Sequence, residues 1–166
     1  MAMRIRTAEE SDGQVIWSII GPTIRAGETY ALARDMSEAE ALACWMEPGR
    51  EVFVAEEDGR VLGTYYMRAN QAGGGDHVAN CGYMTAVAAT GRGVARRMCE
   101  HSLEHARARG YRAIQFNFVV STNDRAIRLW QGLGFREVGR LPLAFRHPVH
   151  GYVDALVMFQ ALSSGT

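Results

Sequence analysis

Two glycines and three arginines gather at one point of the chain, where an apolar stretch gives way to an amphipathic one. The glycines are Gly91 and Gly93, and the positive charge comes from Arg92, Arg96 and Arg97. The first N–H groups of a helix have no partners inside it and lie at the positive end of its dipole, so they bind anions. Glycine carries no side chain that would keep a phosphate from the backbone. The residues predict a phosphate site, and a plain helix start with flexible glycines is the alternative interpretation.

The spacing at this turn differs from the two best-known nucleotide loops. No Gly-Lys-Ser/Thr sequence follows it, so it is not the phosphate loop of a nucleoside triphosphatase. The dinucleotide pattern G-x-G-x-x-G also fails, because Arg96 occupies the position of the third glycine. We therefore expect a phosphate-bearing ligand of another kind.

Other polar residues could form a substrate site. Asn117 lies inside the apolar run FNFVV, where a buried amide needs partners; a substrate or a neighbouring backbone group could supply them. Glu28 and Tyr30 lie in segment 23–36, whose weak periodicity indicates a loop or irregular helix. Such a segment either forms one wall of a substrate-binding pocket or is a solvated connection between helices.

The sequence predicts no metal site. His147 and His150 have no third ligand nearby and are separated by Pro148, so a turn is the better interpretation. The three cysteines are widely spaced within apolar patterns. We expect them to be reduced core residues rather than zinc ligands or disulfide partners.

The elements that position these residues follow from hydrophobic periodicity and turn residues. In chain order they are a strand 3–7, a helix 9–20 closed by Gly21-Pro22, a helix capped by Ser37 that ends before Pro48, strands 51–57 and 60–68 around an Asp58-Gly59 turn, a strand 77–87, a helix from the glycine turn to Gly110, a strand 111–120, a helix 124–133 capped by Asn123, and strands 135–143 and 152–160 joined by the segment AFRHPVHG.

Composition narrows the possible classes of protein. The chain has 166 residues, of which 48% are hydrophobic, and we expect one domain, 1–166. Its 18 basic and 18 acidic residues argue against a protein that holds nucleic acid by bulk charge. An apolar signal region is missing at the N-terminus, and no apolar run is long enough for a membrane span. We expect a cytoplasmic protein that contacts neither nucleic acid nor membrane.

The element order and two motifs resemble the Gcn5-related N-acetyltransferase (GNAT) family over nearly the whole chain. The loop motif of that family is Gln or Arg, two residues, Gly, one residue, and Gly or Ala. Here Gly93 and Ala95 match, and Thr90 replaces the Gln or Arg. The second motif, Asn-x-x-Ala-x-x-Leu-Tyr followed by Gly-Phe, is represented by Asn123, Ala126, Leu129, Trp130, Gly134 and Phe135.

The resemblance implies an α+β fold with a central, mostly antiparallel, twisted sheet of six to seven strands, helices on both faces, and strands splayed at the cofactor cleft. It implies acetyl-CoA as cosubstrate, without a metal. The pyrophosphate would take hydrogen bonds from the N–H groups of Gly91, Arg92, Gly93, Val94, Ala95 and Arg96.

The resemblance also implies roles at the reacting end of the cofactor. The pantetheine arm would pair with the backbone at Tyr83 and Thr85, and Asn123 would bond its amide or thioester end. An amine would attack the thioester directly, with a strand N–H near Thr85 as the oxyanion donor. Asn123, Thr85 and Trp130 are the candidate catalytic residues.

Two departures from the family pattern bear on the acceptor. Many relatives have a Glu base five residues before the position of Thr85, where this chain has Asn80, which cannot take a proton. Trp130 replaces the usual Tyr acid. A thiol with a pKa of about 8.5 leaves without an acid, and an α-amine with a pKa of about 8 needs less help than a lysine at about 10.4. We expect a small, weakly basic amine that contacts Glu28, Tyr30, Asn80 and Asn117.

Within the family, the run FNFVVSTN and the Leu129-Trp130 pair resemble more closely the acetyltransferases of amino-acid analogues, such as phosphinothricin and proline analogues. A protein or peptide N-acetyltransferase and a non-catalytic module that binds acyl-CoA are the alternatives. Small members of the family are often dimers, so the resemblance also implies a homodimer.

Overall fold

The computed structural model describes residues 2–162. Its helices and strands are, in chain order, β1 (Arg4–Thr7), α1 (Gly13–Ala26), α2 (Glu38–Trp45), β2 (Glu51–Glu57), β3 (Arg60–Ala69), β4 (Val78–Thr85), α3 (Val94–Ala108), β5 (Ala113–Val120), α4 (Asp124–Gly132), β6 (Arg136–His147) and β7 (Gly151–Ala161). Short 3₁₀ turns lie at Glu10–Asp12, Gly73–Gly75 and Val87–Ala89.

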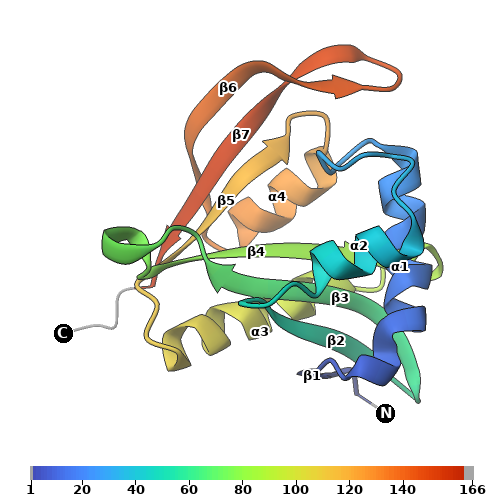
Figure 1. The fold of residues 1–166 in the computed structure, drawn as a ribbon. Coiled ribbons are helices and arrows are strands. Elements are labelled where there is room, and N and C mark those ends of the chain that lie inside the picture. The colour runs from blue at the N-terminus through green and yellow to red at the C-terminus, as the bar shows by residue number, and fades with distance from the viewer. Residues whose placement is uncertain (1, 163–166) are drawn as a thin grey trace.

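One seven-stranded sheet runs through the molecule in the order β1-β2-β3-β4-β5-β7-β6. Every neighbouring pair is antiparallel except β4 and β5, which are parallel. Helices α1 and α2 cover one face, and α3 and α4 pack on the other, so each face buries its own hydrophobic cluster (Figure 1). The expected fold class and the mostly antiparallel sheet are confirmed.

The sheet opens between β4 and β5. These strands pair only at Val78 with Ala113 and at Ala79 with Ile114. Because Ala86 donates its N–H to Leu62 on β3, the backbone groups of Tyr83 and Thr85 face the opposite direction, toward the gap. The cleft that the family resemblance implied is therefore present, and one of its sides is an unpaired strand edge.

Helix α1 does not end at Gly21-Pro22, so that prediction was wrong. The helix continues through Pro22 to Ala26 and ends at Gly27, whose φ is 65°. Proline removes one backbone donor. The helix nevertheless continues, because Ile24, one turn beyond Ile20, is buried in the same core as the rest of the helix.

Two strand boundaries also differ from the predicted ones. The strand predicted to run to Val87 ends at Thr85, and Val87–Ala89 forms a 3₁₀ turn before the glycines. Strand β6 extends to His147, so the first half of the predicted connecting segment AFRHPVHG belongs to the strand. The long β6–β7 hairpin rises away from the rest of the sheet (Figure 1).

The predicted turn at the tip of this hairpin is confirmed, with His147 as its cap. The Nδ1 atom of His147 accepts hydrogen bonds from the backbone N–H groups of Val149 and His150, at 3.1 and 3.2 Å. Among the described residues, no group of three or more His, Cys, Asp or Glu side chains could hold a metal ion.

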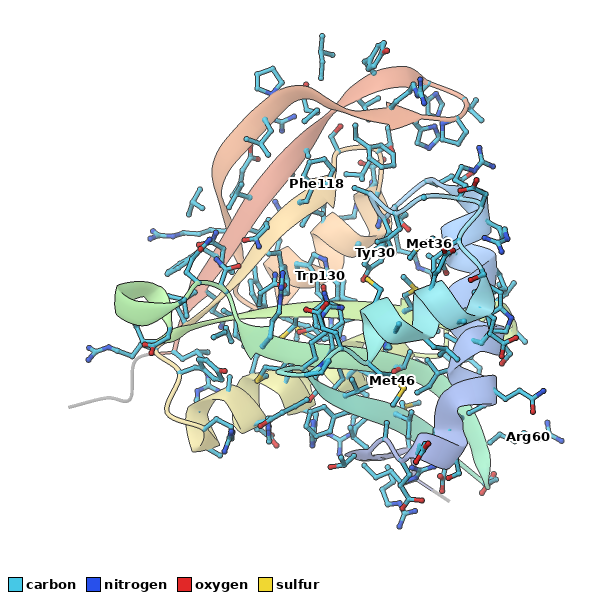
Figure 2. All side chains as sticks on the ribbon, viewed as in Figure 1. Tyr30, Met36, Met46, Arg60, Phe118 and Trp130 are labelled. Carbon is cyan, nitrogen blue, oxygen red and sulfur yellow. The ribbon has the colours of Figure 1, made fainter. Side chains whose placement is uncertain are left out.

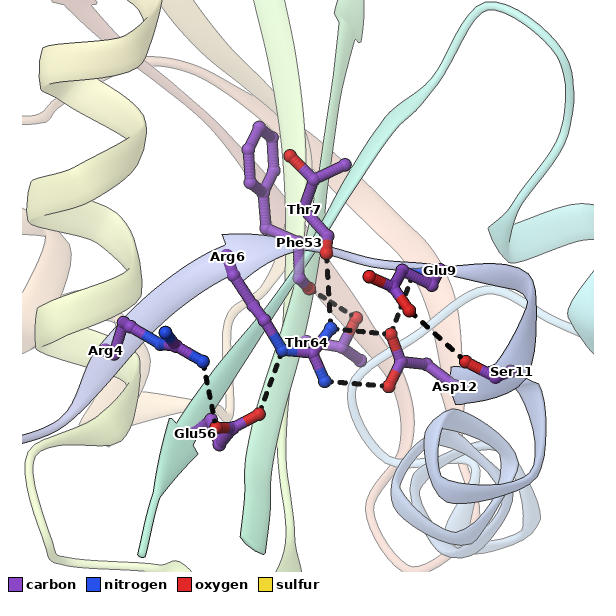
Figure 3. Close-up of polar contacts among 9 residues, drawn as sticks. All are labelled: Arg4, Arg6, Thr7, Glu9, Ser11, Asp12, Phe53, Glu56 and Thr64. Atoms are coloured by element: carbon purple, nitrogen blue, oxygen red, sulfur yellow. Dashed lines mark hydrogen bonds and ion pairs between the residues drawn. The ribbon is translucent and has the colours of Figure 1, made fainter. Parts of the chain in front are cut away.

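Arg6 attaches the N-terminal strand to the rest of the fold (Figure 3). Its two terminal nitrogens contact both carboxylate oxygens of Asp12, at 2.8 and 2.9 Å, and its Nε donates to Glu56 at 2.9 Å. The hydrogen bonds from Arg6 lower the pKa of the Asp12 carboxyl. This paired fork holds β1 against β2 and fixes the start of α1.

No helix in residues 2–162 is long and apolar enough to cross a membrane.

Candidate active site

A cavity of about 760 Å³ lies where β4 and β5 separate. The lining residues come from strands β3 to β5, residues 29–32 before α2, the glycine turn with the start of α3, and α4, with Thr23 from α1. Figure 2 shows Tyr30, Phe118 and Trp130 around this opening, each from a different part of the chain. The volume is in the range of pockets that hold small molecules and cofactors.

The glycine turn at one end of the cavity presents free backbone donors. The φ angles of Gly91 and Gly93 are 85° and 77°, in the left-handed region that glycine adopts without strain. Among the described residues, the N–H groups of Gly91 and of positions 93–96 have no hydrogen-bond partner, since the first helical bond runs from Arg97 to Gly93. Five free donors at the start of a helix are an arrangement that can bind an anion.

Arg92 does not take part in this site, which corrects the prediction for that residue. Its backbone N–H donates to Ala89, and its guanidinium is paired with Glu57 outside the cavity. The sequence indicated the cluster of arginines but not their directions. Arg96 lines the cavity as predicted, and Arg125, which the sequence analysis missed, lies beside it. A Cβ added to Gly91 would lie 3.2 Å from a guanidinium nitrogen of Arg125.

The unpaired edge of β4 continues from the glycine turn along the cavity. Tyr83 and Thr85 line the cavity, and the Tyr83 carbonyl accepts a hydrogen bond from the Tyr30 hydroxyl at 2.9 Å. The Tyr83 side chain instead bonds Ser102 on α3, at 2.6 Å between the two oxygens. What Tyr83 offers at the edge is therefore its backbone, whose carbonyl already accepts from Tyr30.

Helix α4 supplies the opposite side. Asn123 caps the helix by accepting a hydrogen bond from the N–H of Ala126 at 3.4 Å, as predicted, and both residues line the cavity. Trp130 is 8% exposed, and its ring lies 5.0 Å from that of Tyr83 and 5.2 Å from that of Phe116. The indole is thus held as an apolar wall next to the strand edge.

A chain of hydrogen-bonded amide side chains connects two lining residues, Asn80 and Asn117, to Asn70 outside the cavity. Asn80 donates to the carbonyl of Gln115 at 3.0 Å. The Gln115 side chain donates to Asn117 at 2.9 Å, and Asn117 donates to Asn70 at 2.6 Å. Both predicted acceptor residues, Asn80 and Asn117, line the cavity. The partners of Asn117 in the structure are the side chains of Gln115 and Asn70, and not the neighbouring backbone group that was one of the two predicted sources.

Of the two residues predicted to contact the acceptor from the segment before α2, Glu28 and Tyr30, only Tyr30 reaches the cavity. Tyr30 lines it, together with its neighbours Thr29, Ala31 and Leu32. Glu28 is exposed and does not line it. Because the segment turns at Gly27, successive side chains point in different directions, which the sequence alone could not indicate.

The charged groups that line the cavity are all positive. They are Arg68, Arg96 and Arg125, and no Asp, Glu, His or Lys side chain is among the described lining residues. Tyr30, Tyr66, Tyr83 and Cys81 also line it, but burial raises the pKa of all four groups. Near neutral pH the lining therefore offers no group that could take a proton from an amine, in keeping with Asn80 at the usual position of a base.

Arg68 is a second residue that the sequence analysis missed. It follows Tyr66 by two positions on β3, so the two side chains share a face of the sheet, and both line the cavity. Alternation along the predicted strand could have placed them together. The splayed geometry was needed to show that this face is open.

Comparison with known protein families gives a match to the acetyltransferase (GNAT) family over residues 22–135. A GCN5-related N-acetyltransferase from Kribbella flavida is 44% identical, with a TM-score of 0.92 over 96% of this chain and 98% of that one. N-acetyltransferase aca1 from Schizosaccharomyces pombe is 28% identical over an aligned length of 151 residues, and the match covers 81% of this chain and 72% of the relative.

The fold is also similar to that of a phosphinothricin acetyltransferase from Sinorhizobium meliloti, whose structure was solved in complex with acetyl-CoA. The identity is 22%, and the TM-score is 0.85 over 100% of this chain and 91% of the other.

Proposed function

Because this chain belongs to the acetyltransferase (GNAT) family, we propose that it is an acetyl-CoA-dependent N-acetyltransferase that acts on the amine of a small molecule such as an amino acid or an analogue. The observation that carries the proposal is the continuity of the five free N–H groups with the unpaired edge of β4. A single ligand with a phosphate end and an amide-bearing arm fits both. We further propose that residues 1–166 form one such domain.

The residues along the cavity fit acetyl-CoA in order. Gly91 and positions 93–96 would hold the pyrophosphate, with Arg96 and Arg125 as countercharges. The edge at Tyr83 and Thr85 would pair with the arm as an added strand does. The Asn123 oxygen caps α4, which leaves its amide N–H groups to donate to the arm. When bound, acetyl-CoA supplies the activated acetyl group.

The chemistry that the chain itself supplies is electrostatic and positional. A backbone N–H on the free edge near Thr85 would stabilise the negative charge that develops on the acetyl oxygen. Trp130 would keep water from the sulfur end of the arm. Because no lining residue is a base, the amine must reach the site in its neutral form, which a weakly basic amine does at neutral pH.

Arg68 favours an acceptor that also carries a negative charge. Its guanidinium lies 3.8 Å from Glu47, and Glu47 is shared with Arg50 at 3.4 Å. One carboxylate between two guanidiniums leaves net positive charge at this end of the cavity. The carboxylate of an amino acid could pair with Arg68, whereas the further ammonium groups of a polyamine have no carboxylate in the lining.

The alternatives are a protein or peptide N-acetyltransferase and an acyl-CoA-binding module without turnover. Release of thiol from acetyl-CoA, measured with free L-amino acids, spermidine, and peptides with a free N-terminus, distinguishes the three. Turnover with amino acids alone supports the proposal. Turnover with peptides alone, or binding without any turnover, would replace it with one of the alternatives.

We also propose that the protein is cytoplasmic and forms a homodimer through the β6–β7 hairpin. Exposed large apolar side chains gather on this hairpin: Val138, Leu141, Leu143, Val149 and Tyr152. Such residues on a long edge strand favour association with another chain. Light scattering of the purified chain measures the stoichiometry, and a monomer at micromolar concentration would contradict the dimer.

Replacing Asn117 with Ala is expected to raise the KM for the amino-acid acceptor by about fivefold to tenfold, in the range of one lost hydrogen bond. The affinity for acetyl-CoA should stay unchanged, since Asn117 is at the far end of the cavity. Steady-state kinetics and calorimetry measure the two quantities. Asn70→Ala is the matched control: Asn70 bonds Asn117 but does not line the cavity. Equal effects in both variants would assign Asn117 to the network alone.

Replacing Trp130 with Phe is expected to keep kcat within about tenfold of the parent, because a good thiolate leaving group gains little from an acid. Trp130→Tyr, which restores the usual family residue, should gain less than about tenfold for the same reason. The measurement is kcat against pH for the three folded proteins. A fall of a hundredfold in Trp130→Phe, on the order of 2.7 kcal/mol, would show that the indole N–H acts in the transition state.

A further inference from the structure

The Tyr30 hydroxyl lies on the free edge of β4, in contact with a strand that is far from it in sequence. It donates to the Tyr83 carbonyl at 2.9 Å, across a separation of 53 residues. That carbonyl faces the gap between β4 and β5. The ring of Tyr30 packs edge-on against Trp45, with 6.3 Å between the centroids, so the hydroxyl has a fixed place inside the cavity.

The hydrogen bond to Tyr83 decides what else this hydroxyl can recognise. A phenol has one O–H donor and two lone pairs. Its donor is used by the Tyr83 carbonyl, so the oxygen can serve a ligand only as an acceptor. Burial raises the pKa of Tyr30, so the group stays a neutral phenol through the pH range of the reaction. A neutral oxygen that only accepts recognises N–H donors.

We propose that the Tyr30 hydroxyl binds the attacking amine of the acceptor and holds its nitrogen beside the edge of β4. The inference rests on the proposed function, and it names the group that takes the place of a charged residue in positioning the amine. The arginines that line the cavity are donors only, and the side-chain oxygens of Asn80 and Asn117 already accept from Arg68 and Gln115.

The strength of the hydrogen bond to Tyr30 depends on the charge of the attacking nitrogen. As the N–C bond forms and the C–S bond breaks, the electron pair of the C–S bond leaves with sulfur as thiolate. The nitrogen becomes positive until it loses one proton, which goes to water or to the thiolate. An N–H on a positive nitrogen is a stronger donor, so its bond to Tyr30 strengthens in the transition state. Tyr30 itself takes no proton.

A pair of arginines outside the cavity fixes the segment that carries Tyr30. Arg25 donates to the carbonyls of Arg34 and, at 2.5 Å, of Met36, and Arg34 returns a 2.8 Å bond to the Arg25 carbonyl. The stem of Arg34 lies so close over Gly27 that a Cβ there would be 2.5 Å from it. Arg34 is therefore a positioning residue, which acts on the amine only through Tyr30.

The test is Tyr30→Phe, assayed with acetyl-CoA and the L-amino acid of highest turnover. We expect kcat/KM for the amino acid to fall about tenfold to a hundredfold, as for a hydrogen bond to a charged group. The Kd for acetyl-CoA should stay within about twofold. Calorimetry with CoA in place of acetyl-CoA should show weaker binding of the amino acid. The pH dependence of kcat/KM should keep its shape, since the phenol does not titrate.

Two pairs of variants, each with its control, distinguish a role of Tyr30 in binding the amine from a general loss of structure. Tyr111→Phe removes a half-buried hydroxyl outside the cavity and should leave kcat/KM unchanged. Arg34→Met should lower kcat/KM for the amino acid without changing the Kd for acetyl-CoA. Its control is Arg60→Met, which removes an arginine that points into solvent at the β2–β3 turn (Figure 2).

Parent-like kcat/KM in Tyr30→Phe would overturn this inference alone, and so would a loss confined to the affinity for acetyl-CoA, which would place the hydroxyl on the donor side. A lower melting temperature with unchanged kinetics would likewise show that Tyr30 stabilises the fold and does not bind the amine. No thiol release by the parent with any amine would overturn the proposed function, and this inference with it.

Discussion

Replacing Gly93 with Val is expected to weaken acetyl-CoA binding by about a hundredfold, which corresponds to about 2.7 kcal/mol. Gly93 precedes α3 with a φ of 77°, and its N–H is one of the five free donors. A branched side chain would stand between those donors and a phosphate. It would also disfavour the left-handed backbone that directs them into the cavity.

The structure separates the two causes of this effect. A Cβ at Gly93 meets no heavy atom within 4 Å, so the folded protein itself has room for it. Gly110, at the other end of α3, has a φ of 84° and equal room, but lies outside the cavity. Gly110→Val should therefore lose a similar amount of stability, about 1–2 kcal/mol for the strained backbone, and keep its affinity for acetyl-CoA.

Isothermal calorimetry with acetyl-CoA measures both variants, after circular dichroism has shown that each is folded. An unchanged Kd in a folded Gly93→Val protein would contradict the anion site. Equal weakening in Gly110→Val would show that strain in α3, and not the approach of the phosphate, controls binding.

Gly63→Val is expected to lower the free energy of unfolding by about 3 kcal/mol, at the upper end of overpacking effects. Gly63 lies on β3 where α3 crosses it. A Cβ there would be 2.8 Å from Val94 and 2.9 Å from Met98, both of them buried. Met98 ends in a flexible thioether, but Val94 is the first residue of α3 and can yield only if the helix moves.

The Gly63→Val substitution is expected to affect acetyl-CoA binding as well as stability. Because Val94 follows Gly93 directly, a displaced helix start also displaces the free N–H groups, so Gly63→Val should bind acetyl-CoA more weakly as well. Urea unfolding at constant m-value measures the stability. Adding Met98→Ala to Gly63→Val should restore part of the loss, since it removes one of the two clashes.

Gly139→Val provides the comparison for this strand glycine. Gly139 lies on β6, and a Cβ there would meet Val157 at an ordinary 3.8 Å. We expect a change in unfolding free energy within about 1 kcal/mol. Equal stability of Gly63→Val and the parent would mean that α3 can shift without cost, and would remove the basis of the coupling.

Elements whose determinants lie within a few residues could be predicted from the sequence. The capping box at Ser37 and the cap at Asn123 are both formed. Asp58 and Gly59 take φ angles of 50° and 74°, as a tight hairpin turn requires. In each case the stabilising contact joins residues that are close in sequence, so the local sequence was sufficient to predict the cap or the turn.

The wrong boundaries arose where distant contacts outweighed the local signal. Pro22 is a local reason for a helix to end, but burial of Ile24 extends α1 to Ala26. The strand predicted to end at position 143 continues to His147, because Phe145 and His147 are buried. Local propensity is a weak term, and a few buried side chains exceed it.

By itself, the sequence determined where a candidate anion site lies: two glycines and a helix start are neighbours along the chain, and their chemistry follows from backbone geometry. The tertiary structure decided which side chains reach the ligand. Arg92 turns away to Glu57 and Glu28 stays exposed, while Arg68 and Arg125 enter the cavity.

The contact of Tyr30 with Tyr83 shows the reason most clearly, because it joins segments 53 residues apart. It exists only because β4 and β5 separate after two paired residues, and because α1, α2 and the Arg25–Arg34 contacts bring the segment to that edge. Side-chain direction in an irregular segment is set by packing against distant strands, and no periodicity in the sequence encodes it.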